Sequence, residues 1–202
     1  MNMMRFTTMK TKLRKYPSIF LILLLAISSC FLTGCVNQHP KDSKKISQGE
    51  SVETMLEITD PKEKQAVLNA KAKVKALSGN PRIVATSPAV ADICDKLDLD
   101  LVGVPKSSVS KIPSRYKKVK KVGLAMSPDM EIVSSLNPDW ILAPSSLETD
   151  LKPKFEELKN TEYAFLNLRS VQGMYRSVQE LGEIFGKQQE GEKMTKEFTT
   201  FL

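Results

Sequence analysis

The chain has 202 residues, of which 41% are hydrophobic and 26% are charged, proportions typical of a water-soluble globular protein. They exclude a collagen-like, coiled-coil or wholly disordered chain. The formal net charge of +7 comes mostly from residues 1–34, which hold five basic residues and no acids. The rest of the chain has 25 basic and 23 acidic residues, a net charge of +2. Because nucleic acid requires a densely basic surface, this small excess does not predict nucleic acid as a partner.

Residues 1–34 have the composition of a bacterial secretory signal. The basic residues precede the apolar run Ile19–Ile27, and the tetrad Leu32-Thr33-Gly34-Cys35 follows. The apolar run is too short for a spanning helix, which needs about 20 residues. The tetrad resembles a lipobox, so we expect cleavage before Cys35 and attachment of diacylglycerol to its thiol. This predicts an exported protein that a lipid anchor holds on the extracytoplasmic face of the cell membrane.

The segment after the predicted cleavage site is polar and has little to bury. We interpret residues 35–59 as the lipidated N-terminus and a tether. Asp60 followed by Pro61 then predicts the start of an extra helix over residues 60–79, which either packs on the following domain or extends the tether. Cys94 is expected to be a small buried hydrophobe, since a lipidated cysteine leaves it no partner for an intrachain disulfide.

Residues 80–186 alternate short apolar runs with amphipathic patterns, which predicts an α/β lobe. Strands are predicted at 83–85, 101–104, 140–143 and 163–166, with a shorter one near Val122. Helices are predicted at 88–97, 129–136, 149–159 and 171–186. Continuous apolar strands separated by helices indicate a mainly parallel sheet covered by helices on both faces. A further helix is predicted after Gly186, over residues 187–202.

Ligands of open α/β sheets bind beyond the carboxyl ends of the strands, where helices begin. The sequence predicts two such junctions, Ser87-Pro88-Ala89 and Ser127-Pro128, each with a serine N-cap and a proline in the first helical position. Backbone amides at helix N-termini attract carboxylates and other anions. Met126 stands directly before the second junction. Methionine most often fills space in a core, but a position at a helix entrance weakens that interpretation here.

The lobe lacks the residue patterns of common catalytic sites, so we do not expect an enzyme. It has neither the dinucleotide-binding glycine fingerprint nor a phosphate-binding loop. The only histidine of the chain, His39, lies in the predicted tether, which excludes histidine-based triads and multi-histidine metal sites from the lobe. The basic cluster at 115–121 is interpreted as a solvated loop, with attraction of an anionic ligand or a lipid surface as the alternative.

Residues 82–202 resemble the bilobal substrate-binding lipoproteins whose lobes are joined by one long helix, and which serve ABC importers of haem, siderophores and cobalamin. Within that class the chain is similar to the haem-binding lipoproteins of the iron-regulated surface determinant importers. The similar stretches are Arg82-Ile83-Val84, Asp95-Lys96-Leu97-Asp98-Leu99, Val102-Gly103-Val104-Pro105, Pro113-Ser114-Arg115-Tyr116-Lys117 and Gly123-Leu124-Ala125-Met126-Ser127-Pro128.

This resemblance implies a monomeric, non-enzymatic receptor that captures haem and delivers it to an ABC permease. It places the axial iron ligand of the family on Met126, and a thioether is a soft, neutral donor that suits iron. It places the other haem contacts of this lobe on Pro88, Ala89, Ser107 and Ser108. The family has a tyrosine where Ser108 stands, so this chain lacks one aromatic contact with the porphyrin.

The resemblance also places a permease-docking acid on Asp150, with Glu148 as its neighbour. The family has a second lobe that carries an axial histidine. The resemblance therefore implies that residues 187–202 begin the interlobe helix and that this sequence holds the N-terminal lobe alone. Two alternatives remain open: a siderophore or corrinoid as the ligand, and a surface remnant that binds no small molecule.

Overall fold

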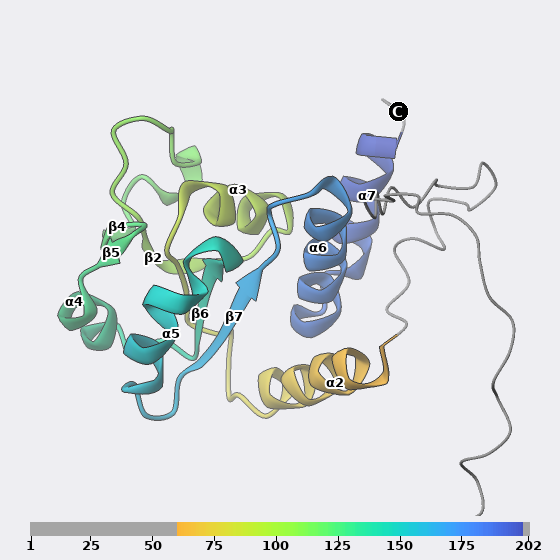
Figure 1. Ribbon diagram of the computed structural model, residues 1–202, viewed down its shortest axis with the longest axis horizontal. Coiled ribbons are helices and arrows are strands. Elements are labelled where there is room, and N and C mark those ends of the chain that lie inside the picture. The colour runs from red at the N-terminus through yellow and green to blue at the C-terminus, as the bar shows by residue number, and fades with distance from the viewer. Residues whose placement is uncertain (1–59, 200–202) are drawn as a thin grey trace, which may run out of the picture. The chain divides into compact units, whose positions relative to one another are not determined.

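The computed structural model describes residues 60–199, with side chains through residue 196, and a five-stranded sheet lies at its centre. The predicted signal, the lipidation site at Cys35, the tether to residue 59 and the side chains of the last residues lie outside this range. The strand order is β3-β2-β1-β6-β7, and every pair is parallel, as predicted (Figure 1). The strands are β1 Ile83–Ala85, β2 Leu101–Val104, β3 Lys120–Lys121, β6 Trp140–Pro144 and β7 Glu162–Leu166.

Two further short strands, β4 Gly123–Leu124 and β5 Ser127–Pro128, form an antiparallel pair beside the main sheet. The strand predicted near Val122 is thus divided, because β3 ends just before this buried residue and β4 begins just after it. The helices are α2 Pro61–Lys75, α3 Pro88–Lys96, α4 Met130–Ser135, α5 Glu148–Glu156, α6 Val171–Phe185 and α7 Gln188–Thr199, with 3-10 turns η1 Ser114–Tyr116 and η2 Ser145–Leu147. Within residues 60–199, no helix has the length and apolar character that crossing a membrane requires.

Side chains of the central strand β1 point alternately into two apolar cores. Ile83 and Ala85 belong to the core that α3, α6 and α7 cover, and Val84 belongs to the core that α4 and α5 cover. All three residues are at most 1% exposed. Cys94 of α3 lies in the first core, and its burial raises the pKa of the thiol to about 12, so it acts as the small buried hydrophobe that was predicted.

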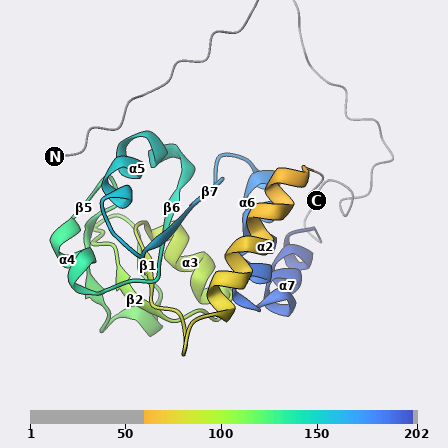
Figure 2. The ribbon, with the colours of Figure 1, turned by 90° about the horizontal axis from the view of Figure 1, so that it is seen from below.

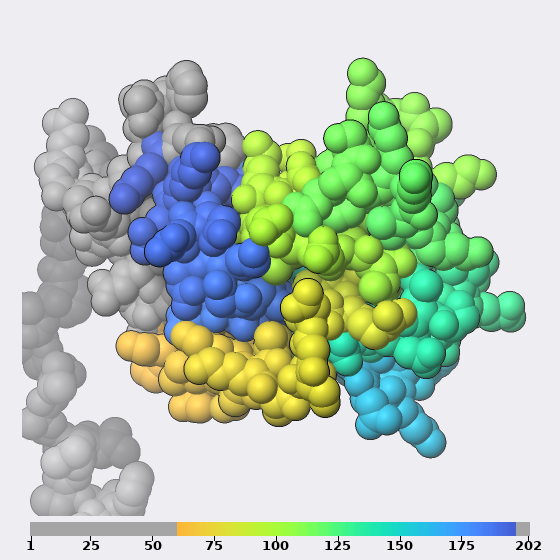
Figure 3. All heavy atoms as spheres, turned by 180° about the vertical axis from the view of Figure 1, so that it is seen from behind, coloured from red at the N-terminus to blue at the C-terminus, as the bar shows by residue number. Residues whose placement is uncertain are grey.

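Helix α2 packs on α6, which answers whether it joins the lobe or extends the tether (Figures 2 and 3). Val67 is buried in the core that contains α6, and Lys71 Nζ lies 3.3 Å from a carboxylate oxygen of Glu183. The side chain of Asp60 caps the helix, as predicted. The helix ends at Lys75, four residues short of the predicted end at residue 79, and the amide of Ala76 donates to the carbonyls of Ala72 and Lys73 in its last turn.

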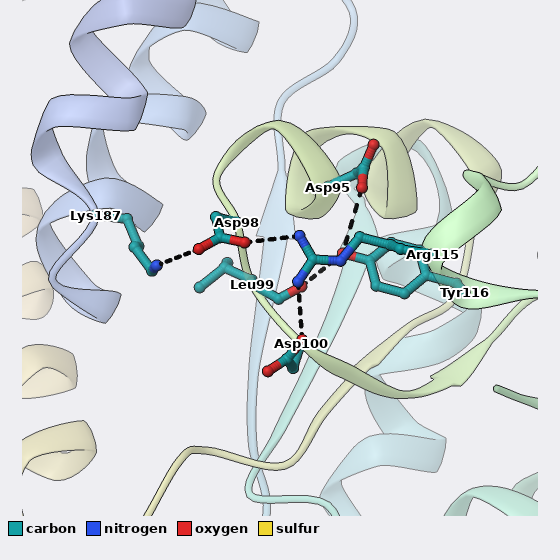
Figure 4. A network of polar contacts seen from close by, with 7 residues as sticks. All are labelled: Asp95, Asp98, Leu99, Asp100, Arg115, Tyr116 and Lys187. Carbon is teal, nitrogen blue, oxygen red and sulfur yellow. Dashed lines mark hydrogen bonds and ion pairs between the residues drawn. The ribbon is translucent and has the colours of Figure 1, made fainter. Parts of the chain in front are cut away.

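Arg115 fastens the segment between β2 and β3 to the amino end of β2 (Figure 4). Its guanidinium lies 2.8 Å from carboxylate oxygens of both Asp98 and Asp100. The neighbouring Tyr116 is buried and donates a hydrogen bond of 2.6 Å to the carbonyl of Leu99. The interpretation of residues 115–121 as a solvated loop is therefore wrong for this part of the cluster, because long-range partners hold both side chains.

A pair of carboxyl groups lies between α2 and α6. Glu180 is partly buried and forms a hydrogen bond with the side chain of Glu63. A carboxylate oxygen of Glu63 also lies 3.3 Å from a guanidinium nitrogen of Arg176. Burial, this hydrogen bond and the charge of Glu63 raise the pKa of Glu180 to about 7, while Arg176 acts in the opposite direction. The native protein therefore retains a proton on Glu180 at a pH where an exposed glutamate is ionised.

We expect the stability of the protein to fall as the pH rises from about 5 to about 7. In this window the unfolded chain gives up the proton of Glu180 while the native state keeps it, so raising the pH favours unfolding. Urea unfolding of Glu180→Gln across the window should show a flatter pH dependence than the wild type. Glu157→Gln, at an exposed position on the lobe, should keep the wild-type slope. An unchanged slope in Glu180→Gln would contradict this assignment.

Candidate ligand-binding site

Parallel strands end at the same edge of a sheet, and the predicted site residues gather at this carboxyl edge. Pro88 and Ala89 begin α3 directly after β1, Ser107 and Ser108 lie in the loop after β2, and Met126 follows β3. The strand order reverses between β1 and β6, so the switch point at which α/β proteins bind ligands lies at the carboxyl ends of these two strands. The topology therefore brings together segments that are separated by about forty residues in the sequence.

The first predicted junction is confirmed. The side chain of Ser87 caps α3 by accepting a hydrogen bond of 3.2 Å from the amide of Val90, and Pro88 occupies the first helical position. The amide of Thr86 donates a hydrogen bond of 3.0 Å to the carbonyl of Leu142, which fastens the ends of β1 and β6 to each other. Pro88 is partly exposed and Ala89 is exposed, so both present their surfaces at the switch point.

The second predicted junction is wrong: Ser127 and Pro128 do not begin a helix but form strand β5. They pair with β4 in an antiparallel hairpin, and the turn between the two strands is Ala125-Met126. Helix α4 begins two residues later, because the carboxylate of Asp129 accepts hydrogen bonds of 3.1 Å from the amides of its first turn. Both serine and aspartate are good N-caps, and here the aspartate takes this position.

Two backbone hydrogen bonds hold the hairpin of β4 and β5 against the end of β2 and the loop after it, and a third closes the base of the hairpin. The amide of Val122 donates to Val104 at 2.9 Å, and the amide of Asp129 donates to Val122 at 2.7 Å. The amide of Lys106 donates to the carbonyl of Gly123 at 2.6 Å, which ties the loop of Ser107 and Ser108 to the hairpin. The hairpin is thus fixed by main-chain contacts.

Met126 at the tip of the hairpin is 74% exposed, so it does not fill space in a core. Leu124, two residues earlier, is 59% exposed, and Val109 in the loop after β2 is 95% exposed. The sequence does not single out either residue, since one leucine in a two-residue strand and one valine in a loop carry no periodic signal. Met126 and Leu124 therefore leave the hairpin with exposed apolar side chains at the carboxyl edge, which suits the face of a flat apolar ligand.

Ser107 and Asp150 lie at the same edge of the sheet in different settings. The hydroxyl oxygen of Ser107 accepts a hydrogen bond of 3.0 Å from the amide of Ser110, a local turn that leaves Ser108 exposed. Asp150 and Glu148 are exposed in the first turn of α5, which follows β6 through η2. These two acids therefore present negative charge to solvent beyond the end of β6.

Comparisons with known proteins agree with this fold. The periplasmic binding protein family matches residues 83–202. The chain is 35% identical over 117 residues to the high-affinity heme uptake system protein IsdE of Staphylococcus aureus, an alignment that covers 58% of this chain and 39% of that protein.

Solved structures of the same kind resemble the lobe. An ABC transporter substrate-binding protein from Listeria monocytogenes EGD-e is 43% identical to this chain, with a TM-score of 0.58. The match covers 60% of this chain and 46% of the Listeria chain. S. aureus IsdE complexed with heme is 33% identical with a TM-score of 0.57 and the same coverage. The petrobactin-binding protein YclQ of Bacillus subtilis shares the fold at 24% identity, with a TM-score of 0.53 and coverage of 60% and 44%. The chain thus matches less than half the length of each of these proteins.

We expect Gly123→Ala to destabilise the protein through the hairpin. Gly123 has a φ of +96°, and an added Cβ would stand 2.9 Å from the amide nitrogen of Asp129. The left-handed backbone alone costs a residue with a side chain about 1–2 kcal/mol, which urea unfolding can measure. Gly79→Ala is the matched control, since its Cβ would meet nothing within 4 Å. Equal free energies of unfolding for the two variants would show that the hairpin does not need the glycine.

Proposed function

Since the chain belongs to the periplasmic binding protein family, we propose that it is part of a substrate-binding protein of an ABC importer and that its ligand is haem. The observation that supports haem best is Met126, a thioether 74% exposed at the tip of a hairpin on the edge of the sheet where ligands bind. A methionine held there by main-chain contacts stabilises no core, and its sulfur is a soft donor for iron.

In this proposal Met126 ligates the haem iron, and the residues around it border the macrocycle. Leu124, exposed on the same hairpin, would contact the porphyrin face. Pro88 and Ala89 stand at the start of α3, where the helix N-terminus favours the negative charge of a haem propionate. Ser107 and Ser108 form the loop that is hydrogen-bonded to the hairpin, so they would line the same ligand.

The remaining roles follow from the same proposal. Lipidation of Cys35 anchors the exported protein to the cell membrane, and the protein acts as a monomeric receptor rather than as an enzyme. Asp150, with Glu148 beside it, contacts the permease that receives the haem. Residues 187–202, which include α7, begin the interlobe helix of the class. The lobe described here would contact one face of the haem, the face on which Met126 ligates the iron.

Titration of the full chain with haem, followed by absorbance, tests this proposal. We expect saturable binding with a shifted Soret band, and Met126→Leu should weaken binding by about tenfold or more and change the spectrum. Leucine keeps the apolar volume of methionine but has no sulfur, so the change reports on ligation rather than on packing. Met130→Leu, next to the hairpin in the first turn of α4, is the matched control and should behave as the wild type.

The same titration with a ferric siderophore distinguishes haem from the alternative ligand. Binding of the siderophore with no response to haem would overturn haem as the ligand while keeping the class of protein. Wild-type haem spectra in Met126→Leu would overturn the role of the thioether. A folded protein that binds neither compound would contradict a receptor function for this lobe on its own.

A further inference from the structure

A basic face lies beside the candidate site, and the proposed function does not use it. Residues 106–121 contain seven basic residues and no acid. One of them, Arg115, is bound to three aspartates, at distances of 2.8 to 3.8 Å. The other six are exposed and belong to no ion pair within the described part of the chain. We call them the basic face: Lys106, Lys111, Lys117, Lys118, Lys120 and Lys121.

The fold holds these lysines on its surface in a fixed arrangement. Three apolar residues between them point inward: Tyr116 is buried in the core, and Ile112 and Val119 pack against it. Lys120 and Lys121 form β3, whose one partner in the described sheet is β2, and the amide of Lys106 is bonded to the hairpin. The segment is therefore an ordered part of the lobe, and its six lysines remain exposed to solvent.

Two of the six lysines can be explained by the protection of an exposed sheet edge, and four cannot. Lysines on an edge strand prevent pairing with another chain, and Lys120 and Lys121 meet that need. The other four lysines lie outside β3, in the loop after β2 and in the segment that leads from η1 to the strand. Among the described residues, the acids that contact this segment are those bound to Arg115, so the six unpaired lysines fit a broad, negative partner better than they fit a protein surface of mixed charge.

We propose that the basic face docks the lobe on the anionic phospholipid surface of the membrane. This inference rests on the lipid anchor of the proposed function, but not on the identity of the ligand. The predicted lipidation site at Cys35 and the start of α2 at Pro61 are 26 positions apart, so the connection reaches at most about 90 Å. The anchor would thus keep the lobe close to the membrane, where several lysines together add measurably to the affinity for anionic headgroups.

Vesicle sedimentation of the full chain tests this docking. The variant replaces Lys117, Lys118, Lys120 and Lys121 with glutamine. The control replaces four exposed lysines elsewhere: Lys75, Lys152, Lys159 and Lys193. Vesicles contain phosphatidylcholine alone or with an equal part of phosphatidylglycerol. Any contribution of the N-terminal residues is common to all three proteins. At low salt we expect the wild type and the control to partition onto the anionic vesicles about tenfold more than the variant does, with no difference on neutral vesicles.

Added salt should remove the difference between the proteins, because the contact is electrostatic. Equal partitioning of the variant and the control onto anionic vesicles would overturn the proposal. So would weaker haem binding in the variant with unchanged vesicle binding, since the lysines would then serve the ligand. A failure of haem binding in the wild type would affect the proposed ligand alone, and the vesicle result would stand independently.

Discussion

The burial of β1 between two layers of helices is the constraint on which the rest of the lobe depends. All three of its side chains are almost completely removed from solvent, and its neighbours β2 and β6 are hydrogen-bonded to it in parallel. Parallel strands need helical crossovers, so the chain must return to the amino edge after each strand and leave its loops at the carboxyl edge. The position of the candidate site therefore follows from the packing of this strand.

The hairpin of β4 and β5 places one candidate ligand residue, Met126, at this carboxyl edge. Its main-chain bonds to β2 and to Asp129 fix the turn, and they allow Met126 to remain exposed without loosening the core. An exposed methionine gains nothing from burial in the isolated lobe, so its contribution lies in what it can contact. The soft sulfur, the exposed Leu124 on the same hairpin and the N-terminus of α3 suit a ligand with a metal, an apolar face and acidic groups.

Much of the fold could be predicted from the sequence, because apolar runs and helix caps are local signals. The strands around Ile83 and Trp140, the cap at Ser87 and the C-terminal glycine of α6 at Gly186 all lie where the patterns predict them. The second junction could not be predicted, since both Ser127 and Asp129 suit an N-cap, and pairing with β4 decides between them. Contacts between distant segments, such as Arg115 with Asp98, carry no local signal at all.

Nuclear magnetic resonance of the full chain with ¹³C-labelled methionine methyl groups tests the central claim most directly. The account predicts that stoichiometric haem strongly shifts or broadens the methyl signal of Met126, while the signal of Met194, which is buried on α7, stays in place. Assignment by Met126→Leu identifies the signal. Haem binding that leaves the Met126 methyl signal unchanged would contradict the claim that the hairpin tip is where the ligand is held.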